Sequence, residues 1–292
     1  MALVAVTAVW GSTFYLIHDL LGSMDAVDFL AVRFTIAAVC LLLLFGRSLR
    51  TLDRRACVAG VLLGLVYAVA QVLQTVGLAH TAASRSGFIT GLYVVLTPVL
   101  GALLLRERVG RATWVAVVLS VLGLAVLSLG DVASPVGLGE ALTLACAAVY
   151  AIHILGVARF STAELATALS TVQMVALAVG CSVVAAVDGV GLPPSTGAWW
   201  AVVYMAVVAG AGALWAQTWA QAHLSASRAA IVMTLEPVFA AGFAVTLGGE
   251  SVTSRMVLGG GLVLAAMYVV ELAGRRGRGA DGPPLEALHH EP

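Results

Sequence analysis

The stretch QTVGLAHTAASR at Gln74–Arg85 recurs in the second half of the chain as QTWAQAHLSASR at Gln217–Arg228. Seven of the twelve positions are identical, and the same offset places Glu107 opposite Glu250. We interpret this match as an internal duplication, because similarity at a fixed offset is typical of a repeated structural unit. The chain should therefore contain two copies of one unit.

The composition predicts that both units lie in a membrane. Hydrophobic residues make up 61% of the 292 residues and charged residues only 10%, whereas a soluble domain has about 25% charged residues. Apolar runs follow one another with short polar breaks, and one membrane span takes about 20 apolar residues. The ten expected spans cover residues 2–18, 27–46, 56–78, 82–105, 112–130, 136–157, 163–187, 198–221, 227–247 and 255–273.

The fold expected from these two observations is an all-α integral membrane protein with ten transmembrane helices in two inverted five-helix repeats. Five is an odd number, so the second copy enters the membrane from the opposite side, as in many secondary transporters. Residues 1–131 would form the first repeat and residues 132–273 the second. Residues 274–292, which are rich in Arg, Gly and Pro, would form a disordered cytoplasmic tail.

The placement of arginine predicts the orientation of the chain. All fifteen basic residues are arginines, and breaks rich in arginine face the cytoplasm. Both termini are expected inside, because that choice places twelve of the fifteen in cytoplasmic breaks or the tail. The twelve are Arg47, Arg50, Arg54, Arg55, Arg106, Arg108, Arg111, Arg159, Arg228, Arg275, Arg276 and Arg278.

Three stretches carry a resemblance to a known family. They are WGSTF at Trp10–Phe14, ASRSGFITGLYVVLTPVLGALL at Ala83–Leu104 and TLEPVFAAGFAVTLGGE at Thr234–Glu250. Together with the repeated plan, they make the chain resemble the EamA family of the drug/metabolite transporter superfamily. The resemblance implies a multi-pass carrier of the bacterial inner membrane that exports amino acids or similar small metabolites. It also implies a central cavity lined by spans 1, 3, 4, 6, 8 and 9.

Glu236 is the foremost candidate for a binding residue. It lies eight residues after Arg228, so about 12 Å into a helix and near the middle of the membrane. A charge there costs about 2.5–3.5 kcal/mol, which makes a functional role plausible. Pro237 follows it and leaves the carbonyl of Met233 without a donor. Glu236 would bind substrate or carry a proton, or else it is a protonated residue that shapes a proline kink.

Other polar and aromatic residues are candidates with a structural alternative. Gln74 and Gln217 are repeat mates that either line the cavity or pack between helices. His153 is either a proton relay or a packing residue. Trp10 and Tyr93 would wall an apolar pocket, although such residues also form interfacial belts. Pro98 would mark a helix break in span four, as Pro237 does in span nine.

Arg33 is a charged residue inside the second expected span. It could hold a carboxylate through two parallel hydrogen bonds, as arginine often does. The alternative is that the side chain reaches outward to Asp28 or to lipid headgroups, with its apolar stem in the membrane. The sequence leaves both possibilities open.

Several classes of function are excluded or disfavoured. The near-neutral, sparsely charged chain does not suit nucleic acid, and no Walker, HExxH or GxSxG motif is present, so neither ATP-driven transport nor catalysis is expected. No catalytic residue, metal site or cofactor is expected. The expected partners are the lipid bilayer and a small-molecule substrate, with a proton as a candidate coupling ion and a monomer or homodimer as the assembly. A non-transport membrane sensor or structural component is the alternative.

Overall fold

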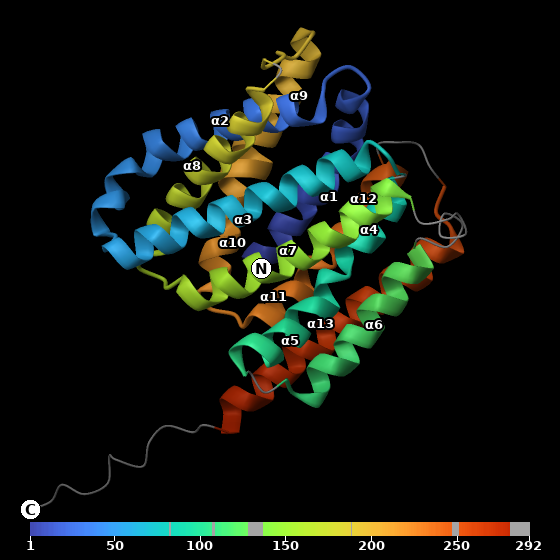
Figure 1. Ribbon diagram of the computed structural model, residues 1–292. Helices are drawn as coiled ribbons and strands as arrows, with labels where there is room; N and C mark the ends of the chain where they lie inside the picture. Colours follow the sequence, from blue (N-terminus) through green and yellow to red (C-terminus); the bar gives the residue numbers. More distant parts are fainter. Residues whose placement is uncertain (82, 107–108, 128–136, 188, 247–250, 281–292) are drawn as a thin grey trace, which may run out of the picture.

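A computed structural model of the chain describes residues 1–81, 83–106, 109–127, 137–187, 189–246 and 251–280, and every regular element in these ranges is a helix (Figure 1). Glu107, Arg108, Glu250 and residues 281–292 of the expected tail lie outside the described residues. The helices are α1 (Ala2–Leu21), α2 (Ala26–Phe45), the 3₁₀-helix η1 (Gly46–Thr51), α3 (Arg54–Leu78), α4 (Ala83–Gly91), α5 (Tyr93–Leu105), α6 (Arg111–Leu127), α7 (Leu138–Phe160), α8 (Ala166–Ala185), α9 (Thr196–Ala206), the π-helix η2 (Val207–Gly212), α10 (Ala213–Gln221), α11 (Ala226–Met233), α12 (Glu236–Thr246) and α13 (Ser254–Ala280).

Seven of the described helical stretches are long and apolar enough to cross a membrane. They are Ala26–Thr51, Arg54–Leu78, Ser86–Leu105, Leu138–Phe160, Ala166–Ala185, Thr196–Gln221 and Ala226–Phe243. Three apolar stretches, Ala2–Thr13, Arg111–Leu127 and Ser254–Val270, are shorter. The chain is therefore a multi-pass helical membrane protein. The last helix continues to Ala280, beyond the expected end of the final span at residue 273.

Polar residues in the short breaks define where several helices begin. Asp53 precedes α3 and its Oδ1 accepts a hydrogen bond from the backbone N–H of Ala56 at 2.7 Å. Asp25 caps α2 through the N–H of Val27 at 2.8 Å, and Ser195 caps α9 through the N–H of Ala198 at 3.1 Å. These side chains satisfy backbone donors that the first helical turn leaves free.

The helices of the two expected repeats are interleaved (Figure 1). The second helix of the chain, α2, packs against α8, and α6 packs against α13. In the middle of the molecule, α3 lies against both α7 and α8, and α1 lies against α12. The principal contacts therefore join one half of the chain to the other, so neither half has a core of its own.

Glycine allows the closest of these helix contacts. A Cβ atom built on Gly123 would lie 2.7 Å from the carbonyl oxygen of Gly259, and one built on Gly259 would lie 2.7 Å from the carbonyl oxygen of Gly123. On α3, Gly64 faces the backbone carbonyl of Gln173 and the side chain of Ala176 on α8. Small residues at such positions let helix backbones approach each other in membranes, where packing drives association.

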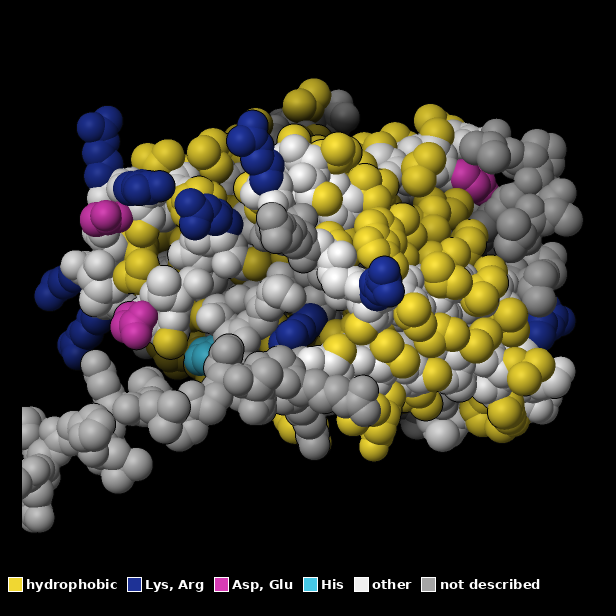
Figure 2. Space-filling view, turned by 90° about the horizontal axis from the view of Figure 1, so that it is seen from below, with side chains coloured by type: hydrophobic (Ala, Val, Ile, Leu, Met, Phe, Trp, Pro, Cys, Tyr) yellow, Lys and Arg dark blue, Asp and Glu magenta, His cyan; other side chains and the backbone are white. Residues whose placement is uncertain are grey.

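The surface is unusually apolar for a folded chain, and some polar and charged side chains are buried within a largely apolar interior. Large apolar side chains such as Leu43, Leu103 and Val183 are exposed, while Arg33 and His153 are buried. Figure 2 shows a broad apolar surface beside a region where arginine side chains gather. An apolar exterior suits lipid contact, and a polar interior is the usual place for functional groups in membrane proteins.

The close approach of α3 to α8 generates the first testable prediction. Gly64→Ala should lower the free energy of unfolding by about 1–3 kcal/mol, because the new methyl group overlaps the Gln173 carbonyl and Ala176. Thermal unfolding of the purified protein in detergent would measure the change. Gly46→Ala is the matched control, because nothing lies within 4 Å of a Cβ there. Equal unfolding temperatures for the two variants would contradict the packing we describe.

Candidate functional site

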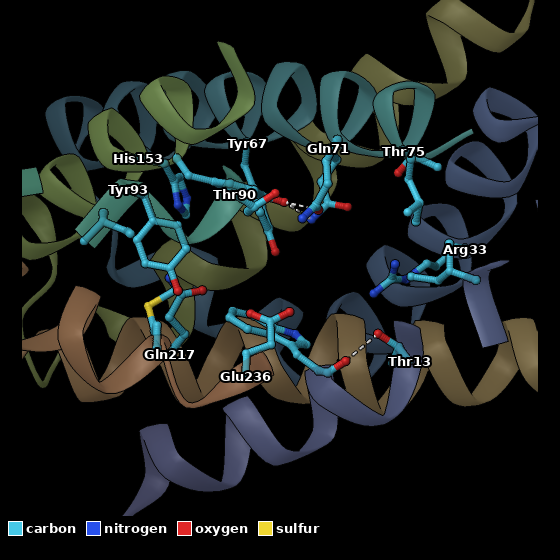
Figure 3. A pocket seen from close by; sticks show the side chains of 17 residues that line it. Thr13, Arg33, Tyr67, Gln71, Thr75, Thr90, Tyr93, His153, Gln217 and Glu236 are labelled. Carbon is cyan, nitrogen blue, oxygen red and sulfur yellow. Dashed lines mark hydrogen bonds between the residues drawn. The ribbon is translucent and has the colours of Figure 1, made fainter. Parts of the chain in front are cut away.

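A cavity of about 60 Å³ lies between the helices of the two halves (Figure 3). Seven of the candidate residues from the sequence line it: Trp10, Arg33, Gln74, Tyr93, His153, Gln217 and Glu236. Pro98 and Pro237 are not among the lining residues. The full lining is Trp10, Thr13, Ile17, Arg33, Tyr67, Gln71, Gln74, Thr75, Leu78, Thr90, Tyr93, Tyr150, His153, Ile154, Gln217, Met233 and Glu236.

Several residues that line the cavity are separated by the offset of the repeated sequence stretch. Four pairs of lining residues keep this offset of 143 residues, which is the spacing expected for equivalent positions of a duplicated unit. They are Trp10 with His153, Gln74 with Gln217, Thr90 with Met233, and Tyr93 with Glu236. Only the glutamine pair kept the same side chain, so the two halves contribute different chemistry at equivalent places.

Two helix breaks place Tyr93 and Glu236 at the cavity. One break lies at Leu92, between α4 and α5, and the other lies at Thr234 and Leu235, between α11 and α12. Both breaks contain 3₁₀-type bonds, from the N–H of Leu92 to the carbonyl of Ile89 at 3.1 Å and from the N–H of Leu235 to the carbonyl of Val232 at 3.1 Å. Each break thus ends one helix and starts another at the cavity.

The prolines do not lie where these breaks occur. Pro98 lies inside α5, so the break in this stretch precedes the residue that we expected to mark it. Pro237 is the second residue of α12, a position where proline is well tolerated because the first turn has no acceptor for its missing N–H. It therefore follows the break and starts the next helix. α11 ends at Met233, the residue whose carbonyl Pro237 leaves without a donor, so the second break lies in the turn just before Pro237.

Glu236 presents its carboxylate to the cavity without a protein partner. Figure 3 shows the side chain pointing into the open space between Gln71, Arg33 and Gln217. Within the described part of the chain, no hydrogen bond or ion pair to this carboxylate is found. The helix α1 approaches closely beneath it, since a Cβ on Gly11 would lie 2.8 Å from the Glu236 carbonyl oxygen. The carboxylate is thus held at the cavity with its acceptor oxygens free.

Arg33 brings the opposite charge to the same cavity from α2. Its side chain is 5% exposed, and its Nε donates a hydrogen bond to the carbonyl of Met205 at 3.2 Å. The guanidinium lies over the rings of Phe34 and Phe29, with its central carbon 4.9 and 5.7 Å from their centroids. The alternative that this side chain reaches outward to Asp28 or headgroups is wrong, because it is buried and lines the cavity.

A hydrogen-bond chain fixes the glutamines on the α3 side. The Nε2 of Gln71 donates to the hydroxyl of Tyr150 at 2.9 Å, and that hydroxyl donates to Oε1 of Gln74 at 2.7 Å. Tyr67 stacks on His153 with ring centroids 4.6 Å apart, and His153 Nε2 lies 2.9 Å from Oε1 of Gln173. Part of the polar wall is therefore internally satisfied, and His153 has both a packing contact and a place at the cavity.

Two buried acceptors at the cavity have no partner. Oε1 of Gln217 and Oγ1 of Thr90 are buried and lack a hydrogen bond, although both residues line the cavity. Unsatisfied buried polar atoms are uncommon in native proteins and call for an explanation such as a ligand or water. Thr90 was not a candidate from the sequence, although its repeat mate Met233 lies three residues before Glu236 and could have indicated it.

No metal site is indicated by the geometry. Among the described residues, no group of three His, Cys, Asp or Glu side chains could hold a metal ion. The chemistry that remains is recognition by hydrogen bonds, by one carboxylate, by one guanidinium and by aromatic rings. Such a lining can select and hold a small polar molecule.

Comparisons with known proteins agree with the helical membrane fold around this cavity. The model of the EamA-like transporter family matches residues 1–129 and 137–272. A protein of Archaeoglobus fulgidus, named an uncharacterized transporter, is 30% identical over 272 residues, which cover 93% of this chain and 85% of that protein. A protein of known crystal structure superposes with a TM-score of 0.77 at 18% identity, covering 94% of this chain and 96% of that chain. At that identity the structural likeness shows the fold alone.

The glutamine–tyrosine chain generates a second prediction. Tyr150→Phe should lower the free energy of unfolding by about 1–2 kcal/mol, because it removes two interhelical hydrogen bonds and keeps the ring. Thermal unfolding in detergent would measure the loss. Tyr268→Phe serves as the control, because Tyr268 is 65% exposed on α13. If both variants unfold at the wild-type temperature, the chain of hydrogen bonds does not hold the two sides of the cavity together.

Proposed function

The chain belongs to the EamA-like transporter family, and we propose that it is a secondary transporter of amino acids or similar small organic metabolites. It works by alternating access and exports its substrate across the bacterial inner membrane, with both termini in the cytoplasm. The chain is a multi-pass membrane protein and a membrane transporter on the evidence of its family and helices. The substrate class, the direction of transport and the transport mechanism are our proposals.

The observation that carries the proposal is the presence of two opposite charges, without an ion pair between them, in one cavity. Glu236 and Arg33 both line the cavity, yet no ion pair joins them among the described contacts. Charges in the membrane interior are costly and mark substrate or ion pathways. An amino acid at neutral pH carries one positive and one negative group, so it could neutralise both side chains at once.

The repeated architecture supports alternating access. In our proposal, five helices of each half form one repeat, and the second repeat is inverted relative to the first. The contacts of α2 with α8 and of α6 with α13 join helices of equal rank in the two repeats, and four lining pairs keep the offset of the repeated stretch. Two inverted copies around one site can exchange conformations and open the site to either side of the membrane.

A proton is the coupling ion that fits the cavity. Glu236 carries a carboxyl group that points into the space where substrate would bind. A carboxyl can bind either a proton or the ammonium group of a substrate, but not both at the same oxygen. Exchange of the two at Glu236 would couple outward movement of substrate to inward movement of protons.

The direct test is transport by the purified protein in liposomes. Liposomes loaded with a mixture of amino acids and other small metabolites should lose a selected class, as measured by mass spectrometry. Glu236→Gln should reduce that efflux by about tenfold or more, because a neutral amide replaces a charge-assisted interaction. Glu164→Gln is the control, because Glu164 is fully exposed in the segment between α7 and α8. No selective efflux from the wild type would favour a sensor or structural role instead.

The native cysteines test the proposed orientation. Cys57 is exposed near the start of α3, whereas Cys146 and Cys181 are buried and Cys40 is partly buried. A membrane-impermeant maleimide should label Cys57 in inside-out vesicles and leave it unlabelled in whole cells. Cys57→Ser removes the signal and identifies the labelled site. Labelling of Cys57 from outside whole cells would reverse the orientation that we propose.

A further inference from the structure

Arg33 is a buried cation in the first half of the chain, and the position at the same offset in the second half has no charge. The repeat offset places Ala176 opposite it, so the equivalent position in the second half has no charge. Arg33 packs at the same time against Phe29, Phe34 and the carbonyl of Met205. These contacts position the guanidinium, but none of them carries a full negative charge. A buried charge without such a counterpart is costly, so its presence points to a ligand that supplies one.

The geometry of the guanidinium leaves one edge available. Arginine has five N–H donors, and the one on Nε is used by the Met205 carbonyl at 3.2 Å. The faces of the guanidinium are covered at least in part by Phe34 and Phe29. Figure 3 shows the guanidinium nitrogens directed into the cavity. The edge formed by Nη1 and Nη2 therefore faces the place where substrate would bind.

We infer that Arg33 is the subsite for the carboxylate of the substrate, which it binds through Nη1 and Nη2 in two parallel hydrogen bonds. This inference rests on the proposed function and adds to it a requirement for a carboxylate. A planar guanidinium matches a carboxylate in this bidentate way, and charge-assisted bonds of this kind are about twice as strong as neutral ones. The guanidinium of Arg33 is held at Nε by the Met205 carbonyl, so its Nη atoms can bind the carboxylate of the substrate.

The acceptors elsewhere in the cavity set the orientation of the substrate. Glu236 offers free carboxylate oxygens, and Gln217 and Thr90 each offer an unpartnered acceptor atom. Figure 3 places Gln217 and Arg33 toward opposite ends of the cavity, with Glu236 between them. A primary ammonium has three donors and no acceptor. The substrate therefore lies with its ammonium toward Glu236 and its carboxylate toward Arg33.

The size of the cavity limits what can lie between the two charges. A volume of about 60 Å³ has room for roughly four to six water molecules. This matches the six non-hydrogen atoms of a small amino acid such as alanine. The subsite is thus part of a site for a compact zwitterion.

Arg33 is also connected to the π-helical segment η2. Met205 lies two residues before η2 begins at Val207, and the Nε1 of Trp10 donates to the carbonyl of Ala209 within η2 at 2.9 Å. Trp10 therefore binds the backbone of η2, and Arg33 binds the backbone of α9 just before η2. A π-helical turn offers carbonyls in positions that a regular α-helix does not.

A paired acid and amide test the carboxylate subsite. Transport of L-alanine would be compared with transport of L-alaninamide, which keeps the ammonium and lacks the carboxylate. Wild-type protein in liposomes should move the acid at least about tenfold faster than the amide. Arg33→Gln should slow the acid by about tenfold and leave the amide unchanged, so that the selectivity disappears. Arg33→Lys, which keeps the charge without the planar fork, should fall between the two.

The controls separate binding from folding and from the broader proposal. Arg255→Gln changes an exposed arginine at the start of α13 and should transport like the wild type. Unfolding temperatures of all variants would show whether a loss of transport arises from instability. If Arg33→Gln does not fold, Arg33→Lys takes its place in the comparison of acid with amide. Equal transport of acid and amide by the wild type, or undiminished acid transport by Arg33→Gln, overturns the carboxylate subsite and leaves transport intact. Movement of neither acid nor amide by the wild type overturns the proposed amino-acid transport itself.

Discussion

Polar groups in this protein have to find their partners inside the protein, because a membrane core offers no water to satisfy them. The helices meet that demand for the backbone, and most buried side chains meet it through neighbours. Gln71, Tyr150 and Gln74 satisfy one another in a chain, and His153 has Gln173. Buried polar groups that lack a partner within the protein are therefore candidates for hydrogen bonds or ion pairs with a ligand.

Four groups that lack an ion-pair partner or a hydrogen-bond partner meet at one cavity, whereas buried atoms of Ser86, Ser120 and Gln173 lack a hydrogen bond elsewhere. Glu236, Arg33, Gln217 and Thr90 all line it, and they divide into an acceptor-rich part and a cationic part. The cost of holding such groups in a membrane is offset if a substrate of complementary charge visits the site.

In the duplication that we propose, the cavity lies between equivalent helices of the two copies, and divergence of the copies accounts for its chemistry. In the proposed repeat, Tyr93 and Glu236 occupy one position in two copies, and so do Trp10 and His153. Two identical copies would give a symmetric cavity that could not distinguish the ends of an asymmetric substrate. The two halves differ at two such positions. Glu236 stands where the first half has Tyr93, and Arg33 stands where the second half has Ala176. These differences make the two ends of the site chemically distinct.

The sequence alone determined the class of protein, the approximate helix positions, the family and six of the lining residues, because continuous apolar runs and a fixed repeat are one-dimensional signals. The tertiary structure alone decided that the helices break at Leu92 and at Thr234–Leu235 rather than at Pro98. It also decided that Arg33 faces inward and that Tyr150 joins two glutamines. The physical reason is that a helix apolar on every side shows no preferred face in its sequence. Which residues point at the cavity therefore depends on how neighbouring helices pack, and that information lies in contacts between residues far apart in the chain.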